Sequence, residues 1–212
     1  MKAAINITGD MCSIKGAKDV NEDYALILPP YGACLADGMG GEQMGEAVAR
    51  CACKVAMKAM AEGFSASESL ERAQAYSREL VDNLDCGRSG AALTVVRYGD
   101  GNIEVAWAGD VECMRLSSES GLLQTVTKPD RGRRGLTNAL GGSRMVVNTA
   151  DCMLDPGDRI LLCSDGVWEN INLPEIRDSL ANAKSPLEAA VVLTIGHKFA
   201  DDATAVVLFA NQ

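Results

Sequence analysis

Short segments with strand character follow one another along this chain, and only two pairs of helix-like segments interrupt them. Apolar segments of this length, bounded by turn residues, are typical of strands. A parallel α/β sheet would need strands and helices in regular alternation, which this order does not provide. The sequence therefore predicts the α+β class, with antiparallel sheets packed together and the helix pairs on the outside.

The expected elements can be placed from these patterns. Ser65 and Glu68 form a capping box, which marks the start of the second helix. The predicted helices span 43–63, 65–84, 172–183 and 185–200. The predicted strands span 3–8, 24–29, 31–36, 90–98, 103–109, 113–117, 122–127, 144–149, 159–164 and 203–209.

The bulk properties of the chain fit one globular domain over residues 1–212, because 47% of its residues are hydrophobic. The net charge of −9 argues against nucleic acid or an anionic membrane as a partner. The first residues resemble no targeting peptide, and no apolar run approaches the ~18 residues that span a bilayer. Eight scattered cysteines among apolar neighbours are expected to be reduced and buried, which indicates a cytoplasmic protein.

Four aspartates occupy the tips of apolar strands. Asp37 follows "ACLA", Asp110 follows "VAWAG", Asp165 follows "ILLCS", and Asp201 precedes "ATAVVLF". A single aspartate in such a place is most commonly a turn residue. Four carboxylates brought together by the sheets would repel one another unless a cation lay among them. Oxygen ligands without histidine favour Mg²⁺ or Mn²⁺ over zinc.

The stretch "ADGMGGEQ" (36–43) places glycines around Met39, which lets the backbone turn sharply or approach another group closely. It is not a dinucleotide-binding loop, because Gln43 replaces the third glycine and Asp37 would repel a pyrophosphate. The sequence contains no P-loop, no GxSxG elbow, and no cysteine followed six places later by arginine. Metal-assisted hydrolysis is the chemistry that remains.

An ordered set of motifs carries a resemblance through nearly the whole chain: "NEDYALI" (21–27), "ADGMGG" (36–41), "GEAVA" (45–49), "WAGDVECMRL" (107–116), "LTNALGG" (136–142), "ILLCSDGVWENI" (160–171) and "DDATAVVL" (201–208). In this order they resemble the metal-dependent protein phosphatases, the PPM or type 2C family. The resemblance implies a four-layer α/β/β/α sandwich of two antiparallel sheets, with a two-metal site at one end.

The resemblance also implies the metal ligands. Asp37 would bridge two Mn²⁺ or Mg²⁺ ions, and the backbone carbonyl of Gly38 would bind one of them. Asp165 and Asp201 would complete the other ion's ligands. Two further carboxylates would act largely through bound water: Glu22 and Asp23. Two cations roughly 3.5–4 Å apart lower the pKa of a bridging water, which supplies hydroxide for in-line attack on phosphorus.

Lys18 stands where the family usually has a phosphate-binding arginine, so its grip on phosphate lacks the planar, two-point geometry of a guanidinium. Asp110 and Glu169 align with positions that can hold a third, weaker metal ion. The changes "GAAL" (90–93) and Val111-Glu112 alter the surroundings of Asp110, so this third ion is the least expected of the three. Met39 cannot donate a proton to the leaving group.

The implied activity is Mn²⁺/Mg²⁺-dependent hydrolysis of phosphoserine and phosphothreonine in proteins, opposing a serine/threonine kinase. The alternative is a phosphatase-like regulatory module that binds a partner with little or no turnover. The segment between Asp110 and Leu136 is short for the family, which leaves a shortened flap region. It contains the basic stretch "KPDRGRRG" (128–135), which is either a solvated turn or a docking surface for an acidic phosphoprotein.

Overall fold

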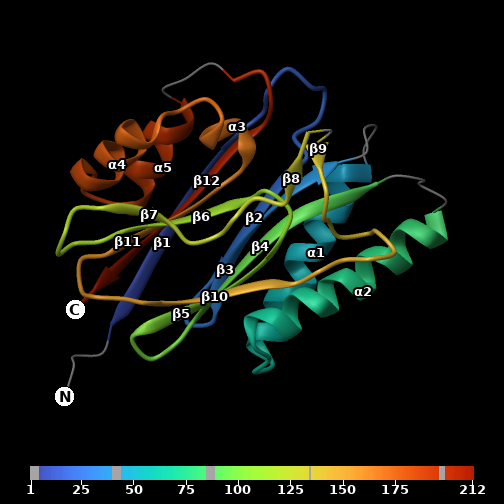
Figure 1. Ribbon diagram of the computed structural model, residues 1–212, viewed down its shortest axis with the longest axis horizontal. Helices are drawn as coiled ribbons and strands as arrows, with labels where there is room; N and C mark the ends of the chain where they lie inside the picture. Colours follow the sequence, from blue (N-terminus) through green and yellow to red (C-terminus); the bar gives the residue numbers. More distant parts are fainter. Residues whose placement is uncertain (1–4, 40–43, 85–88, 134, 196–198) are drawn as a thin grey trace.

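The computed structural model describes residues 5–39, 44–84, 89–133, 135–195 and 199–212. Its described residues form two five-stranded antiparallel sheets, a small two-stranded hairpin, and a helix pair on each outer side of the sheets (Figure 1). The predicted α+β class and the four-layer order are therefore confirmed. Gly40, Gly41 and Gln43, which belong to the glycine-rich stretch, lie outside the described residues.

The two sheets draw their strands from different parts of the chain. The first has the order β1 (Asn6–Ile14), β12 (Ala203–Asn211), β11 (Arg159–Cys163), β6 (Glu112–Leu116) and β7 (Leu123–Thr125). The second has the order β10 (Asn148–Met153), β5 (Asn102–Ala108), β4 (Gly90–Tyr98), β3 (Gly32–Met39) and β2 (Asp23–Leu28). The hairpin joins β8 (Arg131–Gly132) to β9 (Gly135–Leu136).

One helix pair covers each sheet because its helices bury apolar side chains against that sheet. Helices α1 (Met44–Ala61) and α2 (Ala66–Leu84) share an apolar core with the second sheet. Helices α4 (Leu173–Asn182) and α5 (Pro186–Ile195) share another with the first sheet. The predicted capping box is present, since Glu68 Oε2 accepts from the backbone N–H of Ser65 at 2.9 Å.

The layer between the sheets is a third apolar core. Its side chains alternate along the strands with those that face the helices, as the two-residue period of a strand requires. The second sheet contributes Leu35, Val96 and Trp107, and the first contributes Leu162 and Val206, all buried. This packing fixes the two sheets face to face, and so fixes which strand ends meet.

Some predicted boundaries differ from the observed ones. The strand predicted at 144–149 is wrong by four residues, because β10 starts at Asn148 and pairs with β5 from Asn148–Trp107 to Met153–Asn102. The preceding residues are instead held by a side chain, since Asn138 Nδ2 donates to the carbonyl of Val146 at 2.7 Å. An unpredicted short helix, α3 (Asp165–Trp168), follows β11 directly.

Antiparallel pairing brings the predicted acidic positions to one end of the sandwich. β2 begins at Asp23, which lies opposite Asp37 near the end of β3. Asp165 opens α3 directly after β11, and Asp201 precedes the start of β12. At the opposite end lie the start of β1 and the end of β12, where Asn6 pairs with Asn211 (Figure 1). Within the described residues, no helix combines the length and the apolar character needed to cross a bilayer.

Candidate active site

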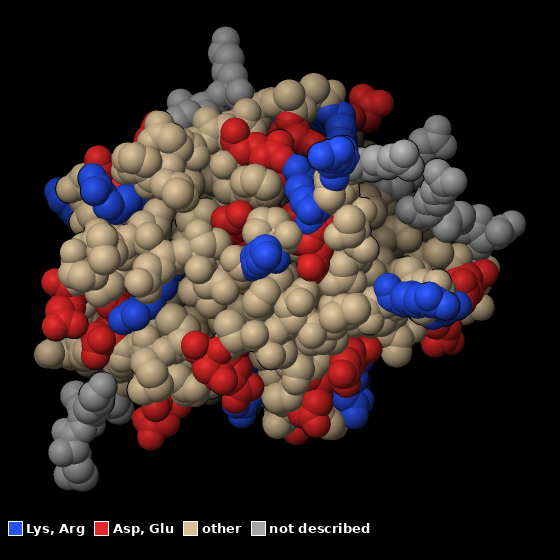
Figure 2. Space-filling model, viewed as in Figure 1, with Lys and Arg blue, Asp and Glu red and all other residues tan. Residues whose placement is uncertain are grey.

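A cavity of about 960 Å³ opens at the acidic end of the sandwich. It is lined by all four aspartates predicted from the strand ends: Asp37, Asp110, Asp165 and Asp201. Lys18, Glu22 and Gly38 line it as well. Figure 2 shows acidic and basic side chains side by side over α3 and β8. The structure thus brings the predicted anionic positions and the predicted phosphate-binding lysine to one place.

Asp23 and Asp37, of which Asp37 lines this cavity, form a cross-strand pair of carboxyl groups. Asp23 is only 7% exposed, and burial raises its pKa to about 7, although the Ser164 hydroxyl donates to its Oδ2 at 2.7 Å. Burial, followed by the charges of Asp23 and Asp165, raises the pKa of Asp37 well above its usual value. These two carboxylates are therefore costly to ionise unless positive charge reaches them.

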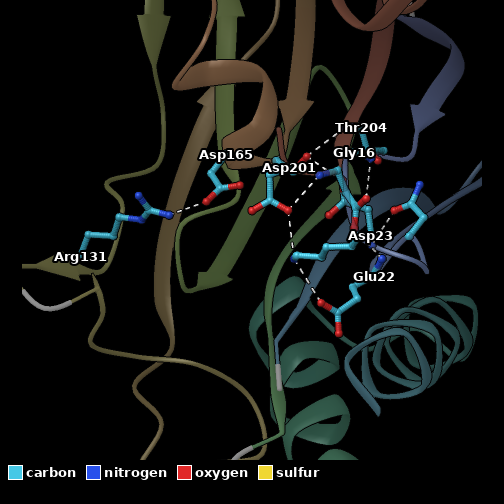
Figure 3. Close-up of polar contacts among 11 residues, drawn as sticks. Gly16, Glu22, Asp23, Arg131, Asp165, Asp201 and Thr204 are labelled. Atoms are coloured by element: carbon cyan, nitrogen blue, oxygen red, sulfur yellow. Dashed lines mark hydrogen bonds and ion pairs between the residues drawn. The ribbon is translucent and has the colours of Figure 1, made fainter. Parts of the chain in front are cut away.

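Lys18 supplies positive charge on one side of the cavity. Its Nζ lies 2.9 Å from Asp201 Oδ1 and 3.1 Å from Glu22 Oε2 (Figure 3). Burial works against the charge on Lys18, but its hydrogen bonds to Asp201 and Glu22 outweigh burial and raise its pKa. Burial likewise opposes ionisation of Asp201, yet the bond from Lys18 holds the pKa of this carboxyl below its usual value. The Asp201 charge is thus compensated within the chain.

Asp202 fixes the segment that carries Lys18. The carboxylate is buried, and its two oxygens accept from the backbone N–H of Gly16 at 2.9 Å and of Glu22 at 2.8 Å. Each oxygen satisfies one donor, so both ends of the segment between β1 and β2 are held to the start of β12. No sequence pattern assigned Asp202 this role, because its partners lie 180 or more positions away.

Arg131 supplies positive charge on the other side. Its guanidinium donates through Nε to Asp110, through Nη2 to Asp165, and through Nη1 to Glu169. The Arg131–Asp165 contact lies on the side of Asp165 away from Asp201 (Figure 3). Sequence reasoning placed this arginine only within a basic loop. Its spacing after Asp110 gave no sign that its guanidinium would contact carboxylates from other parts of the chain.

Asp165 divides its two oxygens between different surroundings. Oδ2 accepts from Arg131, while Oδ1 is buried and has no hydrogen-bond partner among the described residues. Burial and the charge of Asp110 raise the pKa of Asp165, although Arg131 acts in the opposite direction. One oxygen of this carboxylate thus remains available to a cation in the cavity.

The residues of the cavity fit divalent cations by their donor chemistry. In the described part of the chain, no three acidic, histidine or cysteine side chains already stand close enough together to hold a metal ion. Three buried carboxylate oxygens among the described residues nevertheless lack any hydrogen-bond partner: Glu22 Oε1, Asp23 Oδ1 and Asp165 Oδ1. Buried acceptors are normally satisfied, and carboxylate oxygens are the ligands that Mg²⁺ and Mn²⁺ prefer. The unsatisfied atoms and their charge are therefore what such ions would complete.

Gly38 has a packing reason to be glycine. A Cβ at this position would lie 2.3 Å from the carbonyl oxygen of Gly45 in α1 and 2.8 Å from that of Glu22. The Gly38 N–H also donates to the carbonyl of Glu22 at 3.1 Å. The close approach predicted from the glycine cluster is thus made to other backbone. The metal contact through the Gly38 carbonyl stays a prediction.

Comparison with known proteins gives one family match. The model of the family described as Stage II sporulation protein E (SpoIIE) matches residues 30–209. No curated protein matches the chain.

Several solved structures share the fold across nearly the full length of both chains. The catalytic domain of serine/threonine protein phosphatase PstP, in complex with two manganese ions, has a TM-score of 0.88 at 21% identity, covering 99% of this chain and 100% of that one. PppA, a key regulatory component of T6SS in Pseudomonas aeruginosa, has a TM-score of 0.85 at 23% identity, covering 98% and 99%. The PPM Ser-Thr phosphatase MsPP from Mycobacterium smegmatis, in complex with cacodylate, has 0.83 at 22%, covering 98% and 99%.

Proposed function

Because the chain belongs to the SpoIIE family and has the fold of the PPM phosphatases, we propose that it is a Mn²⁺- or Mg²⁺-dependent protein serine/threonine phosphatase. One observation carries the proposal: Glu22 and Asp165 each have a buried carboxylate oxygen without a hydrogen-bond partner among the described residues, and both line the same cavity as Lys18. Lys18 and Arg131 at its edges are already paired with carboxylates, so this acidic cavity accepts a phosphate dianion only when further positive charge is added.

Each carboxylate has a proposed part in holding two cations. Asp37 would contact both, the Gly38 carbonyl would contact one, and Asp165 and Asp201 would hold the other. Two carboxylates would act through water: Glu22 and Asp23. Such ions supply a water of lowered pKa and offset the charge on phosphate. The Asp201 carboxylate would then contact both Lys18 and the ion, because its Oδ1 already accepts a hydrogen bond from Lys18 Nζ.

Lys18 is proposed to position the substrate phosphate. Its side chain is 44% exposed, and it lies on the cavity wall with its segment anchored by Asp202. An ammonium placed in this way offers charge-assisted hydrogen bonds to phosphate oxygens. Because it is a point charge on a flexible stem, it gives less orientation than a guanidinium would.

The side chains that line the cavity limit which group can attack the phosphorus. Among the described residues no Ser, Thr, Cys or His side chain lines the cavity. Met39 lines it, but a thioether cannot act as a general acid or base. A covalent intermediate on a hydroxyl or thiol therefore has no candidate here. We assign the attack to water, in line with the bond from phosphorus to the leaving oxygen.

The proposed substrates are phosphoserine and phosphothreonine in proteins, so that the enzyme would oppose a serine/threonine kinase. We further propose that residues 1–212 act as one phosphatase domain with a shortened flap region, and that the protein works in the cytoplasm without a nucleic-acid or membrane partner. The net charge of −9 supports the last point.

The test is hydrolysis of p-nitrophenyl phosphate and of a phosphothreonine peptide, with Mn²⁺, with Mg²⁺ and with EDTA. We expect turnover with either ion and none with EDTA. Asp37→Asn should remove turnover, whereas Asp10→Asn, on the exposed side of β1, should match the parent protein. Full activity in EDTA would refute the proposal.

The alternative function, a regulatory module with little turnover, also has a structural observation in its favour. Lys18 and Arg131 already compensate several of the carboxylates from within the chain. One structural relative, PppA, is described as a regulatory component. Under this alternative, a phosphopeptide would bind in the presence of Mn²⁺ but would remain intact after hours of incubation, a result that the activity assay distinguishes directly.

A further inference from the structure

Arg131 makes a three-way contact at the rim of the cavity. Each of its three guanidinium nitrogens donates to a different carboxylate: Asp110, Asp165 and Glu169. The guanidinium carbon also lies 5.3 Å from the ring centroid of Trp168, within the range of a cation–π interaction. A planar cation with donors on three sides thus stands at the centre of three acidic side chains.

The backbone around Arg131 is held in place by its own contacts. The neighbouring carboxylate, Asp130 Oδ2, accepts from the backbone N–H of Gly109 at 3.0 Å, from Asn138 Nδ2 at 2.7 Å and from Asn148 Nδ2 at 3.0 Å. The backbone of Arg131 pairs with that of Leu136 in the β8–β9 hairpin. The guanidinium therefore reaches the carboxylates from a loop that is fixed before any ligand binds.

The target of Arg131 is fixed as well. The indole Nε1 of Trp168 donates to the carbonyl of Asp110 at 3.0 Å, which ties α3 to the turn after β5. Asp110 is only 5% exposed, so its charge needs a partner close by. Arg131 provides that partner, and it also joins Asp110 to both acidic residues of the α3 region, Asp165 and Glu169.

We propose that Arg131 takes the place of a third divalent cation, so that this chain binds two metal ions and carries the third positive centre as a side chain. Asp110 and Glu169 are the residues that the sequence resemblance assigned to a third ion, and both now accept from Arg131. The inference rests on the proposed function for the two remaining ions. Asp165 serves both centres, since Oδ2 accepts from Arg131 while Oδ1 has no partner in the described structure.

The substitution has a functional consequence. A tethered guanidinium stays at this position whatever the free metal concentration, whereas a weak third ion would come and go with it. It also cannot carry a water of lowered pKa, so the third centre contributes charge and positioning only. Metal titrations of this protein should therefore show two ions bound and no additional step at higher concentration.

The experiment counts bound Mn²⁺ by equilibrium dialysis of the full chain across micromolar to millimolar metal, with melting temperature as a second readout. We expect two ions for the parent protein, and three for Arg131→Gln, with the third appearing in the millimolar range and raising the melting temperature further. Arg133→Gln, on the exposed part of the same loop, is the matched control and should bind two.

Each outcome decides a different point. A third ion bound by the parent protein, or a count of two in folded Arg131→Gln, overturns the inference while leaving the proposed function intact. No bound Mn²⁺ in the parent protein overturns both. If Arg131→Gln does not fold, Glu169→Gln replaces it, because this side chain is 44% exposed. Glu169→Gln should bind two Mn²⁺ ions, as the parent protein does. A parent protein that binds three ions and a Glu169→Gln variant that binds two would show that a metal ion, and not Arg131, occupies the position between Asp110 and Glu169.

Discussion

Replacing Asp23 by asparagine should stabilise the metal-free protein at neutral pH. Asp23 is buried in a cross-strand pair with Asp37, and burial raises its pKa from 3.8 to about 7. At a pH above both values, a difference of this size corresponds to about 4 kcal/mol of lost stability in the ionised folded state. Asparagine removes the charge and keeps an oxygen that can accept from the Ser164 hydroxyl. Relaxation and water entry reduce the penalty, so we expect a gain of about 2 kcal/mol.

The pH dependence follows from the sign of the pKa change. The folded state holds its proton up to about pH 7, whereas the unfolded state loses it near 3.8, so the parent protein loses stability as pH rises through this window. At pH 5 folded Asp23 is protonated and resembles asparagine, so the gain should fall to about two fifths of its value at pH 7.5.

The assay is thermal unfolding in EDTA at pH 5.0 and pH 7.5. A gain of about 2 kcal/mol corresponds to a rise of about 4–8 °C in the melting temperature of a chain of this length. Asp201→Asn is the control, and its melting temperature should change in the opposite direction. The hydrogen bond from Lys18 lowers the pKa of Asp201, so replacing this carboxylate should lower the melting temperature. Equal gains for Asp23→Asn at both pH values would refute the burial argument. Excess Mn²⁺ should reverse the ranking, since the parent protein alone keeps its full set of ligands.

Three other outcomes are expected. Lys18→Ala should lower kcat/KM by about tenfold or more, and Lys18→Arg should preserve kcat/KM. Unchanged steady-state kinetics in Lys18→Ala would show that this lysine does not contact the substrate. Asp202→Ala leaves the N–H groups of Gly16 and Glu22 without acceptors and should cost about 2–3 kcal/mol by denaturant unfolding, with Asp202→Asn milder. At saturating Mn²⁺, Asp37→Asn should lower kcat by orders of magnitude and Asp110→Asn by much less, and equal losses would contradict this ranking.

The fold could be predicted because its determinants are local. Strand periodicity and helix stripes give the element order, and that order excludes a regular parallel sheet. The gathering of Asp37, Asp165 and Asp201 followed from their places at strand ends, which antiparallel pairing sends to one edge. The start of β10 could not be read in this way, because pairing with β5, and not local composition, decides where that edge strand begins.

The candidate site was predicted less completely than the fold, because ion pairing depends on where loops point. Lys18 was expected to face phosphate, and the structure adds that it also bridges Glu22 and Asp201. Arg131 is separated from its partner Asp110 by 21 positions and from Glu169 by 38, with only a turn-like basic stretch as local context. No pattern in that stretch distinguishes an inward guanidinium from a solvated one.

The carboxylates at this end of the sandwich differ in whether a lysine or arginine of the chain compensates their charge. Lys18 compensates Asp201 and Glu22 on one side, and Arg131 compensates Asp110 and Glu169 on the other. Between them lie Asp23 and Asp37, which no lysine or arginine in the described residues contacts, and burial raises the pKa of both. Positive charge from outside the chain is therefore needed most at the paired positions in β2 and β3. That is where the phosphatase hypothesis requires divalent cations, and the electrostatics point there independently of any sequence resemblance.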